Sequence, residues 1–135
     1  MVMTGITRLR NAFTIASQGS TGGHERHMIT APKHGPQRAH ARRAIMAVLR
    51  RADHQRHRVS FVVTMGDYTQ WELGTANGYD ASSALLECRA ERDDPYLWIE
   101  QQLHRSQHPV DANAIIGVGI RTWPSVNLVP TRLPR

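Results

Sequence analysis

The stretch RVSFVVTMGDYTQWELGT, residues 58–75, carries the clearest structural pattern in the chain. Every second residue from Val59 to Met65 is apolar, and after Gly66 the same parity holds Trp71 and Leu73. A period of two is typical of strands that bury one face against a core. The stretch therefore predicts an antiparallel β-hairpin whose turn follows Met65.

The length of the turn follows from the same pattern. A two-residue turn would pair Phe61 with Glu72 and would mix polar and apolar side chains on each face. A loop of three or five residues pairs Phe61 with Leu73 and Val63 with Trp71, so the apolar residues share one face. We therefore predict the odd-numbered loop.

Upstream of the hairpin, residues 37–53 have the period of an amphipathic helix. Apolar residues recur at helical spacing from Ala41 to Ala52, and Pro36 suits the first helical position, where a missing N–H costs nothing. The other side of this helix is strongly basic. Its arginines are Arg38, Arg42, Arg43 and Arg50, and the basic run continues past the helix with Arg56 and Arg58.

Downstream of the hairpin, the sequence predicts two helices. Asp80 suits the N-cap of a helix over 81–92, and Asp94 followed by Pro95 suits the start of a second one. A strand through residues 96–99 is the alternative for this second segment. The side chains expected to face the core are Ala81, Ala84, Leu85 and Cys88 in the first helix, and Tyr96, Ile99 and Leu103 in the second.

Two apolar segments close the chain. Residues 113–123 and 125–129 are expected to be strands, with a bend at Pro124 between them. The order of elements predicts an α+β fold, in which an N-terminal basic helix, an antiparallel β-hairpin, a helix pair and C-terminal strands form a small two-layer sheet/helix domain. We assign this single domain to residues 36–135.

The first 35 residues differ from the rest of the chain. They contain five glycines and no sustained apolar period, so we expect a flexible basic arm at 1–35. Arginine and serine without an acid before Glu25 are also typical of an organellar presequence. A start at Met28 would instead make residues 1–27 a leader. All three interpretations fit the sequence.

Composition indicates the compartment. The longest apolar run, 44–49, has six residues, far below the roughly 20 that span a bilayer. No apolar segment of the secretory kind follows the first ten residues. A single cysteine cannot form an internal disulfide, which fits a reducing compartment. We expect a cytoplasmic protein without a membrane segment.

The formal net charge of +6 is unevenly distributed. Residues 1–58 hold ten arginines and one lysine against two acids, a net charge of +9, whereas residues 59–135 hold six arginines against nine acids, a net charge of −3. The near absence of lysine would follow from a coding bias and indicates nothing about a ligand. The charge asymmetry itself favours an anionic partner.

These features lead to a functional prediction. A helix with one strongly basic side can bind phosphates, although a solvated side is the alternative. We expect a small nucleic-acid-binding accessory protein that binds without sequence specificity and uses no cofactor. The residues expected to contact phosphates are Arg38, Arg42, Arg43, Arg50, Arg56 and Arg58. The alternative is a non-enzymatic inhibitor or adaptor, of the kind mobile elements encode, whose basic face docks on an acidic or nucleic-acid-binding protein.

No catalytic or metal motif accompanies these features. Structural zinc sites need four ligands, usually with thiolates, and Cys88 is the only thiol. Cys88 lies on a predicted core stripe, so we expect an inert thiol and no enzyme activity. The residues GVG at 117–119 lack the third glycine and the helix of a phosphate loop. Three histidine pairs have ligand-like spacing but basic or polar surroundings: His24/His27, His54/His57 and His104/His108.

Three aromatic residues fall outside the apolar periods, namely Tyr68, Trp98 and Trp123. We expect these side chains to be exposed. Exposed aromatic rings can stack on the bases of single strands, but they are equally typical of protein interfaces. They therefore do not distinguish between the two functional hypotheses.

Overall fold

The computed structural model describes residues 6–9, 25–30, 35–74 and 77–125. Within these residues the strands form one antiparallel sheet in the order β1-β4-β3-β6-β2, and the short β5 also pairs with β3. The strands are β1 (Ile6–Leu9), β2 (Glu25–Thr30), β3 (His57–Met65), β4 (Gln70–Leu73), β5 (Tyr79–Asp80) and β6 (Ile115–Pro124). The helices are α2 (Pro36–His54), α3 (Ala81–Ala90) and α4 (Pro95–Arg105).

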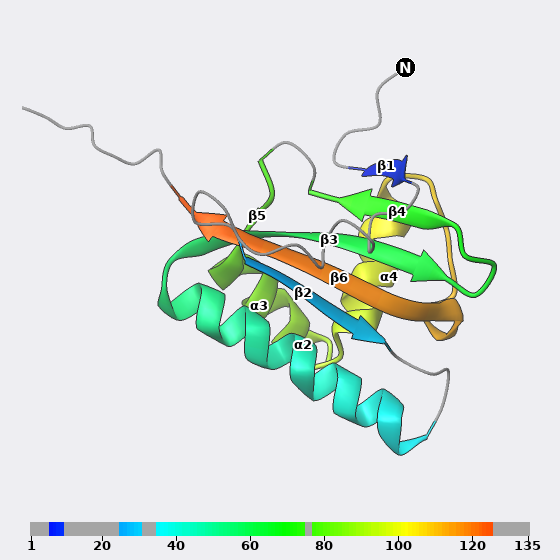
Figure 1. The fold of residues 1–135 in the computed structure, drawn as a ribbon, viewed down its shortest axis with the longest axis horizontal. Helices are drawn as coiled ribbons and strands as arrows, with labels where there is room; N and C mark the ends of the chain where they lie inside the picture. Colours follow the sequence, from blue (N-terminus) through cyan, green and yellow to red (C-terminus); the bar gives the residue numbers. More distant parts are fainter. Residues whose placement is uncertain (1–5, 10–24, 31–34, 75–76, 126–135) are drawn as a thin grey trace, which may run out of the picture.

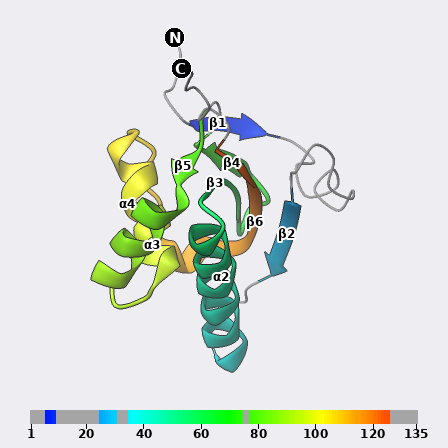
Figure 2. The same cartoon turned by 90° about the vertical axis from the view of Figure 1, so that its left-hand side faces the viewer.

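The helices lie together on one face of the sheet (Figures 1 and 2). This arrangement confirms the predicted α+β fold with a sheet layer and a helix layer. The core lies between the two layers, and its largest fully buried side chains include Phe61 from the sheet, Ile45 and Leu49 from α2, and Trp98 from α4. No helix of the described segments is both long and apolar enough to cross a membrane.

The hairpin of β3 and β4 has the predicted register. Phe61 pairs with Leu73 and Val63 with Trp71, and the loop between Met65 and Thr69 has three residues. The backbone N–H of Met65 donates to the carbonyl oxygen of Thr69 at 2.9 Å, which closes the loop. The odd-numbered loop is therefore confirmed, and the apolar pattern of the two strands was sufficient to predict it.

The helix starts follow their capping residues. Asp94 Oδ1 accepts hydrogen bonds from the backbone N–H groups of Tyr96 at 3.0 Å and Leu97 at 3.4 Å, and Pro95 occupies the first turn of α4. The segment is thus a helix, and the alternative of a strand at residues 96–99 is wrong. Asp80 is the N-cap residue of α3, as predicted, but its side chain makes no hydrogen bond to the backbone N–H groups of the first turn. The predicted inward stripes of both helices are buried.

The prediction for Trp98 is wrong, because this side chain is only 1% exposed. Its indole Nε1 donates to Glu87 Oε1 on α3 at 2.7 Å. The ring meets Phe61 and Tyr79 edge-on, with centroids 5.3 and 5.2 Å apart. α4 therefore buries one side against the sheet and a second side against α3. A single helical stripe read from the sequence accounts for only one of these sides.

The strands β1 and β2 were not predicted. β2 pairs with β6 from Glu25↔Thr122 to Thr30↔Gly117, and β1 pairs with β4, so they form the two edges of the described sheet. Both strands lie within residues 1–35, for which the sequence predicted a flexible basic arm. The expected strand at 125–129 beyond Ser125, and most of the segment interpreted as a presequence or leader at 1–27, lie outside the described residues.

Candidate functional site

The outward side of α2 carries a row of exposed basic residues. Ile45 and Leu49 are fully buried on its inner side, which fixes the direction of the opposite side. The only acid in this helix is Asp53, and its side chain is half-buried. The exposed residues that can carry charge are therefore all basic: His40, Arg43, Arg50, Arg51 and His54.

Arg38 is held by the protein itself. Its guanidinium group donates to the carbonyl oxygens of Ile115 at 2.8 Å and Ala112 at 2.5 Å. The group also lies 3.6 Å from the ring centroid of Tyr96, a favourable cation–π distance. Burial lowers the pKa of Arg38, but an arginine remains charged at neutral pH. Arg38 therefore joins α2 to α4 and β6, and both of its terminal nitrogens donate to backbone carbonyl oxygens.

Arg58 has a similar structural role. Its guanidinium group donates to the carbonyl oxygens of Asn77 and Gly78, which holds the chain just before β5. Gly78 has a φ of +68°, and a Cβ at this position would lie 2.5 Å from the ring of Trp123. The backbone and the indole thus approach closely at this point. The hydrogen bonds of Arg58 hold the backbone in this position.

Three of the six predicted arginines do lie together. Arg42, Arg43 and Arg50 line an open depression of about 420 Å³ with Asp93 at its border. Arg42 is half-buried, and its Nε lies 3.9 Å from Asp94 Oδ1, so part of its charge is compensated. Arg43 and Arg50 are exposed, and neither forms an ion pair with the described residues.

The sequence prediction left out Arg51. This residue is exposed in the last turn of α2, four residues after Ala47, which itself follows Arg43 by four and is also exposed. That spacing is the signal that could have identified it. Arg56, which was predicted, is exposed just beyond the helix.

We call the exposed basic residues of this region the basic ridge. It runs from His40 to His54 along about 20 Å of helix, and Arg56 extends it beyond the end of α2. Its members are His40, Arg43, Arg50, Arg51, His54 and Arg56. Of the six predicted contacts, the structure places Arg43, Arg50 and Arg56 on this ridge, Arg42 beside it, and Arg38 and Arg58 in structural contacts.

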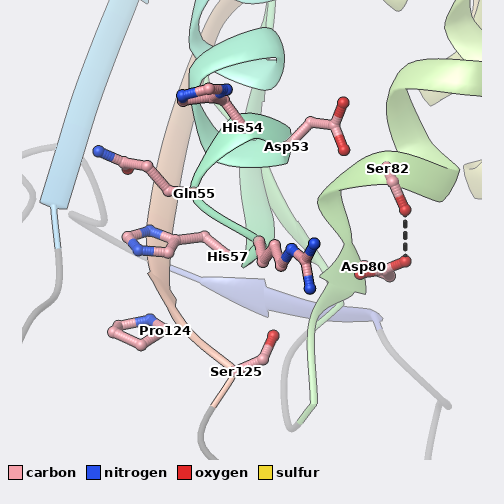
Figure 3. Close-up of a pocket in the computed structure, with 9 residues that line it drawn as sticks. Asp53, His54, Gln55, His57, Asp80, Ser82, Pro124 and Ser125 are labelled. Atoms are coloured by element: carbon pink, nitrogen blue, oxygen red, sulfur yellow. Dashed lines mark hydrogen bonds between the residues drawn. The ribbon is translucent and has the colours of Figure 1, made fainter.

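An open pocket of about 810 Å³, which we call the cavity, lies at the end of the basic ridge (Figure 3). The end of α2, the start of β3, the start of α3 and the end of β6 form its walls. Figure 3 shows His54 and His57 on one side of it and Asp53 and Asp80 on the other. The residues that line it are Asp53, His54, Gln55, Arg56, His57, Asp80, Ser82, Pro124 and Ser125.

Two polar groups of this cavity differ in their hydrogen bonding. The Asp80 carboxylate accepts hydrogen bonds from the hydroxyls of Ser82 at 2.7 Å and Ser83 at 3.4 Å, which orients it. His57 Nδ1 is buried and has no hydrogen-bond partner in the described part of the chain. A buried polar atom without a partner is costly, and this nitrogen is covered by the surrounding protein.

The sulfur and the histidines do not form a reactive centre in the described residues. Cys88 is fully buried, and burial together with the neighbouring Glu87 raises its pKa to about 12, so the thiol is protonated at neutral pH. No three side chains among the described His, Cys, Asp and Glu residues could share a metal ion. His108 instead stacks on Trp71, with ring centroids 4.5 Å apart. His24 lies outside the described residues.

The remaining aromatic predictions have mixed outcomes. Tyr68 at the hairpin tip is 79% exposed, as expected. Trp123 is half-buried, and the guanidinium group of Arg121 lies 4.5 Å from its ring centroid. Neither ring lines the cavity beside the basic ridge.

No model of a known protein family, no curated protein and no solved structure matches the chain. Its function is therefore inferred below from its own residues.

Proposed function

We propose that the protein is a small, non-enzymatic nucleic-acid-binding protein that contacts phosphates through the basic ridge. The observation that carries this proposal is the composition of the exposed side of α2. Arg43, Arg50 and Arg51 project from it, and no acidic side chain of the helix is exposed there.

The state of each guanidinium group determines which arginines contribute. A phosphate contact needs donors that the protein has not already used. Arg38 and Arg58 donate to backbone carbonyl oxygens, and Asp94, 3.9 Å from the Nε of Arg42, offsets part of the charge of Arg42. Among the arginines on and next to α2, the four of the basic ridge have donors available for phosphates. The proposal therefore involves about four phosphate contacts.

Such contacts would not read a sequence. Arginine–phosphate pairs fix the position of a nucleic acid but carry no base information. α2 is also packed against the sheet along its inner side, so only its outer side can contact the phosphate backbone. We expect similar affinity for unrelated sequences of the same length.

A protein partner is the second candidate function. α3 packs beside α2, and its Leu86 is 66% exposed. An exposed apolar side chain can form part of a protein interface, where a partner protein would cover it. Phosphate binding would leave Leu86 unused, so Leu86→Ala should weaken binding only if the partner is a protein.

Charge reversal on and off the ridge tests the proposal. The variant Arg43→Glu/Arg50→Glu should abolish binding to random-sequence duplex at low salt, because two of about four contacts become repulsive. The control variant Arg89→Glu/Arg105→Glu makes the same charge change at exposed positions on α3 and α4. It should retain most of the affinity in a fluorescence-anisotropy titration. Equal losses in both variants would show that only the net charge matters and would contradict a defined interface.

A further inference from the structure

We infer that the cavity at the end of the basic ridge binds one unpaired nucleotide of a single strand whose phosphates follow the ridge. The inference rests on the proposed function and adds a preference for single strands over duplexes. Its starting point is position, because His54 and Arg56 belong both to the ridge and to the cavity wall. A strand that follows the ridge toward the end of α2 therefore reaches the cavity.

The size of the cavity fits this ligand. Its volume of about 810 Å³ lies within the range of small-molecule sites in proteins, roughly 300 to 1,000 Å³. Several separate segments of the chain meet around it, so the folded protein holds the walls in place. A base in a duplex cannot enter such a site without leaving its stack.

The polar groups of the cavity favour a nucleotide over a simple anion. In the cavity, Arg56 is opposed by the carboxylates of Asp53 and Asp80, and two carboxylates would repel an isolated phosphate. A nucleotide also presents sugar hydroxyls and base amino groups, which carboxylates accept from. The mixture of acceptors and donors therefore matches a ligand that carries both kinds of group.

Each wall offers a distinct contact. The Asp80 carboxylate is oriented by Ser82 and Ser83 and can accept from a hydroxyl or amino group. The ring of His57 lines the cavity and can stack on the base. Arg56 is exposed at the mouth and can bind the phosphate that joins this nucleotide to the ridge.

Mononucleotides provide the first test, since they contain the ligand without the strand. In amide NMR spectra of the full chain, nucleoside monophosphates should shift the signals of residues 53–57 and 80–82 in a saturable way. Inorganic phosphate at the same concentration should shift them much less. Equal shifts with phosphate, or nucleotide shifts outside these residues only, would overturn the inference.

The second test compares a short single strand with a blunt duplex that has the same number of phosphates. We expect the wild-type protein to prefer the single strand by about tenfold, the order of magnitude expected for one stacked base. Asp80→Ser keeps a good N-cap residue and should remove this preference. It also removes a negative charge, so an electrostatic effect alone would tighten binding, and a loss of single-strand affinity identifies a lost contact.

A matched control variant and the possible outcomes distinguish a failure of this inference from a failure of the proposed function. Asp111→Ser changes another N-cap aspartate, at the 3-10 turn Ala112–Ala114, away from the cavity, and should leave the preference unchanged. If the single strand and the duplex bind equally and Asp80→Ser has no effect, the inference fails while the proposed function stands. If neither nucleic acid binds at low salt, both fail.

Discussion

Arg38 and Arg43 lie five residues apart on α2, and their guanidinium groups have different surroundings. Arg38 contacts two carbonyl oxygens and the ring of Tyr96, whereas Arg43 is exposed. Helical spacing in the sequence shows which side of a helix a residue occupies. It cannot show that a long side chain reaches Ile115, which lies 77 residues further along the chain. This is why only part of the predicted site forms one surface.

The contrast between these two arginines predicts opposite effects of substitution. Arg38→Met should lower the free energy of unfolding by about 1 to 3 kcal/mol, because two part-buried carbonyl oxygens lose this donor. Arg43→Met should change it by less than about 0.5 kcal/mol but should weaken nucleic-acid binding. Urea unfolding measured by circular dichroism gives both stabilities. Equal stabilities of the two variants would show that the Arg38 contacts contribute nothing to the fold.

At the scale of elements, the sequence predicts well wherever one pattern controls the structure. The alternation around residues 58–75 predicts both the hairpin and its register, and Asp94 with Pro95 predicts the start of α4. The prediction fails where one helix packs against two neighbouring elements, as α4 does at Trp98. It also fails where an edge strand has too few apolar residues to show alternation. β2 is such a strand, since Glu25, Arg26 and His27 precede its only two apolar residues.

A pair of neighbouring residues tests whether β2 belongs to the sheet. Ile29 pairs with Val118 and packs against the core, whereas Met28 is 47% exposed on the other face. We expect Ile29→Ala to cost about 1 to 2 kcal/mol, less than for a fully buried residue. Met28→Ala should cost less than about 0.5 kcal/mol. If thermal or urea unfolding shows no difference between the two variants, residues 25–30 do not contribute as a strand.

At the scale of the whole molecule, the fold places the basic ridge of α2 beside the acidic connection between α3 and α4. The sheet supports α2 from one side through residues such as Ile45 and Leu49, so the basic ridge is held in a fixed position. The acids of the α3–α4 connection, Asp93 and Asp94, lie beside Arg42 at one border of the ridge. The charge asymmetry of the sequence predicted a basic surface, but its borders depend on packing that no local pattern contains.

The salt dependence of binding tests the phosphate interface most directly. Four arginine contacts predict a slope of log affinity against log salt concentration of about −4 for a duplex and about −3 for a single strand. Arg43→Gln/Arg50→Gln should reduce the steepness by about two units while stability stays the same. A wild-type protein that does not bind at low salt, or a slope that the double variant leaves unchanged, would contradict the account.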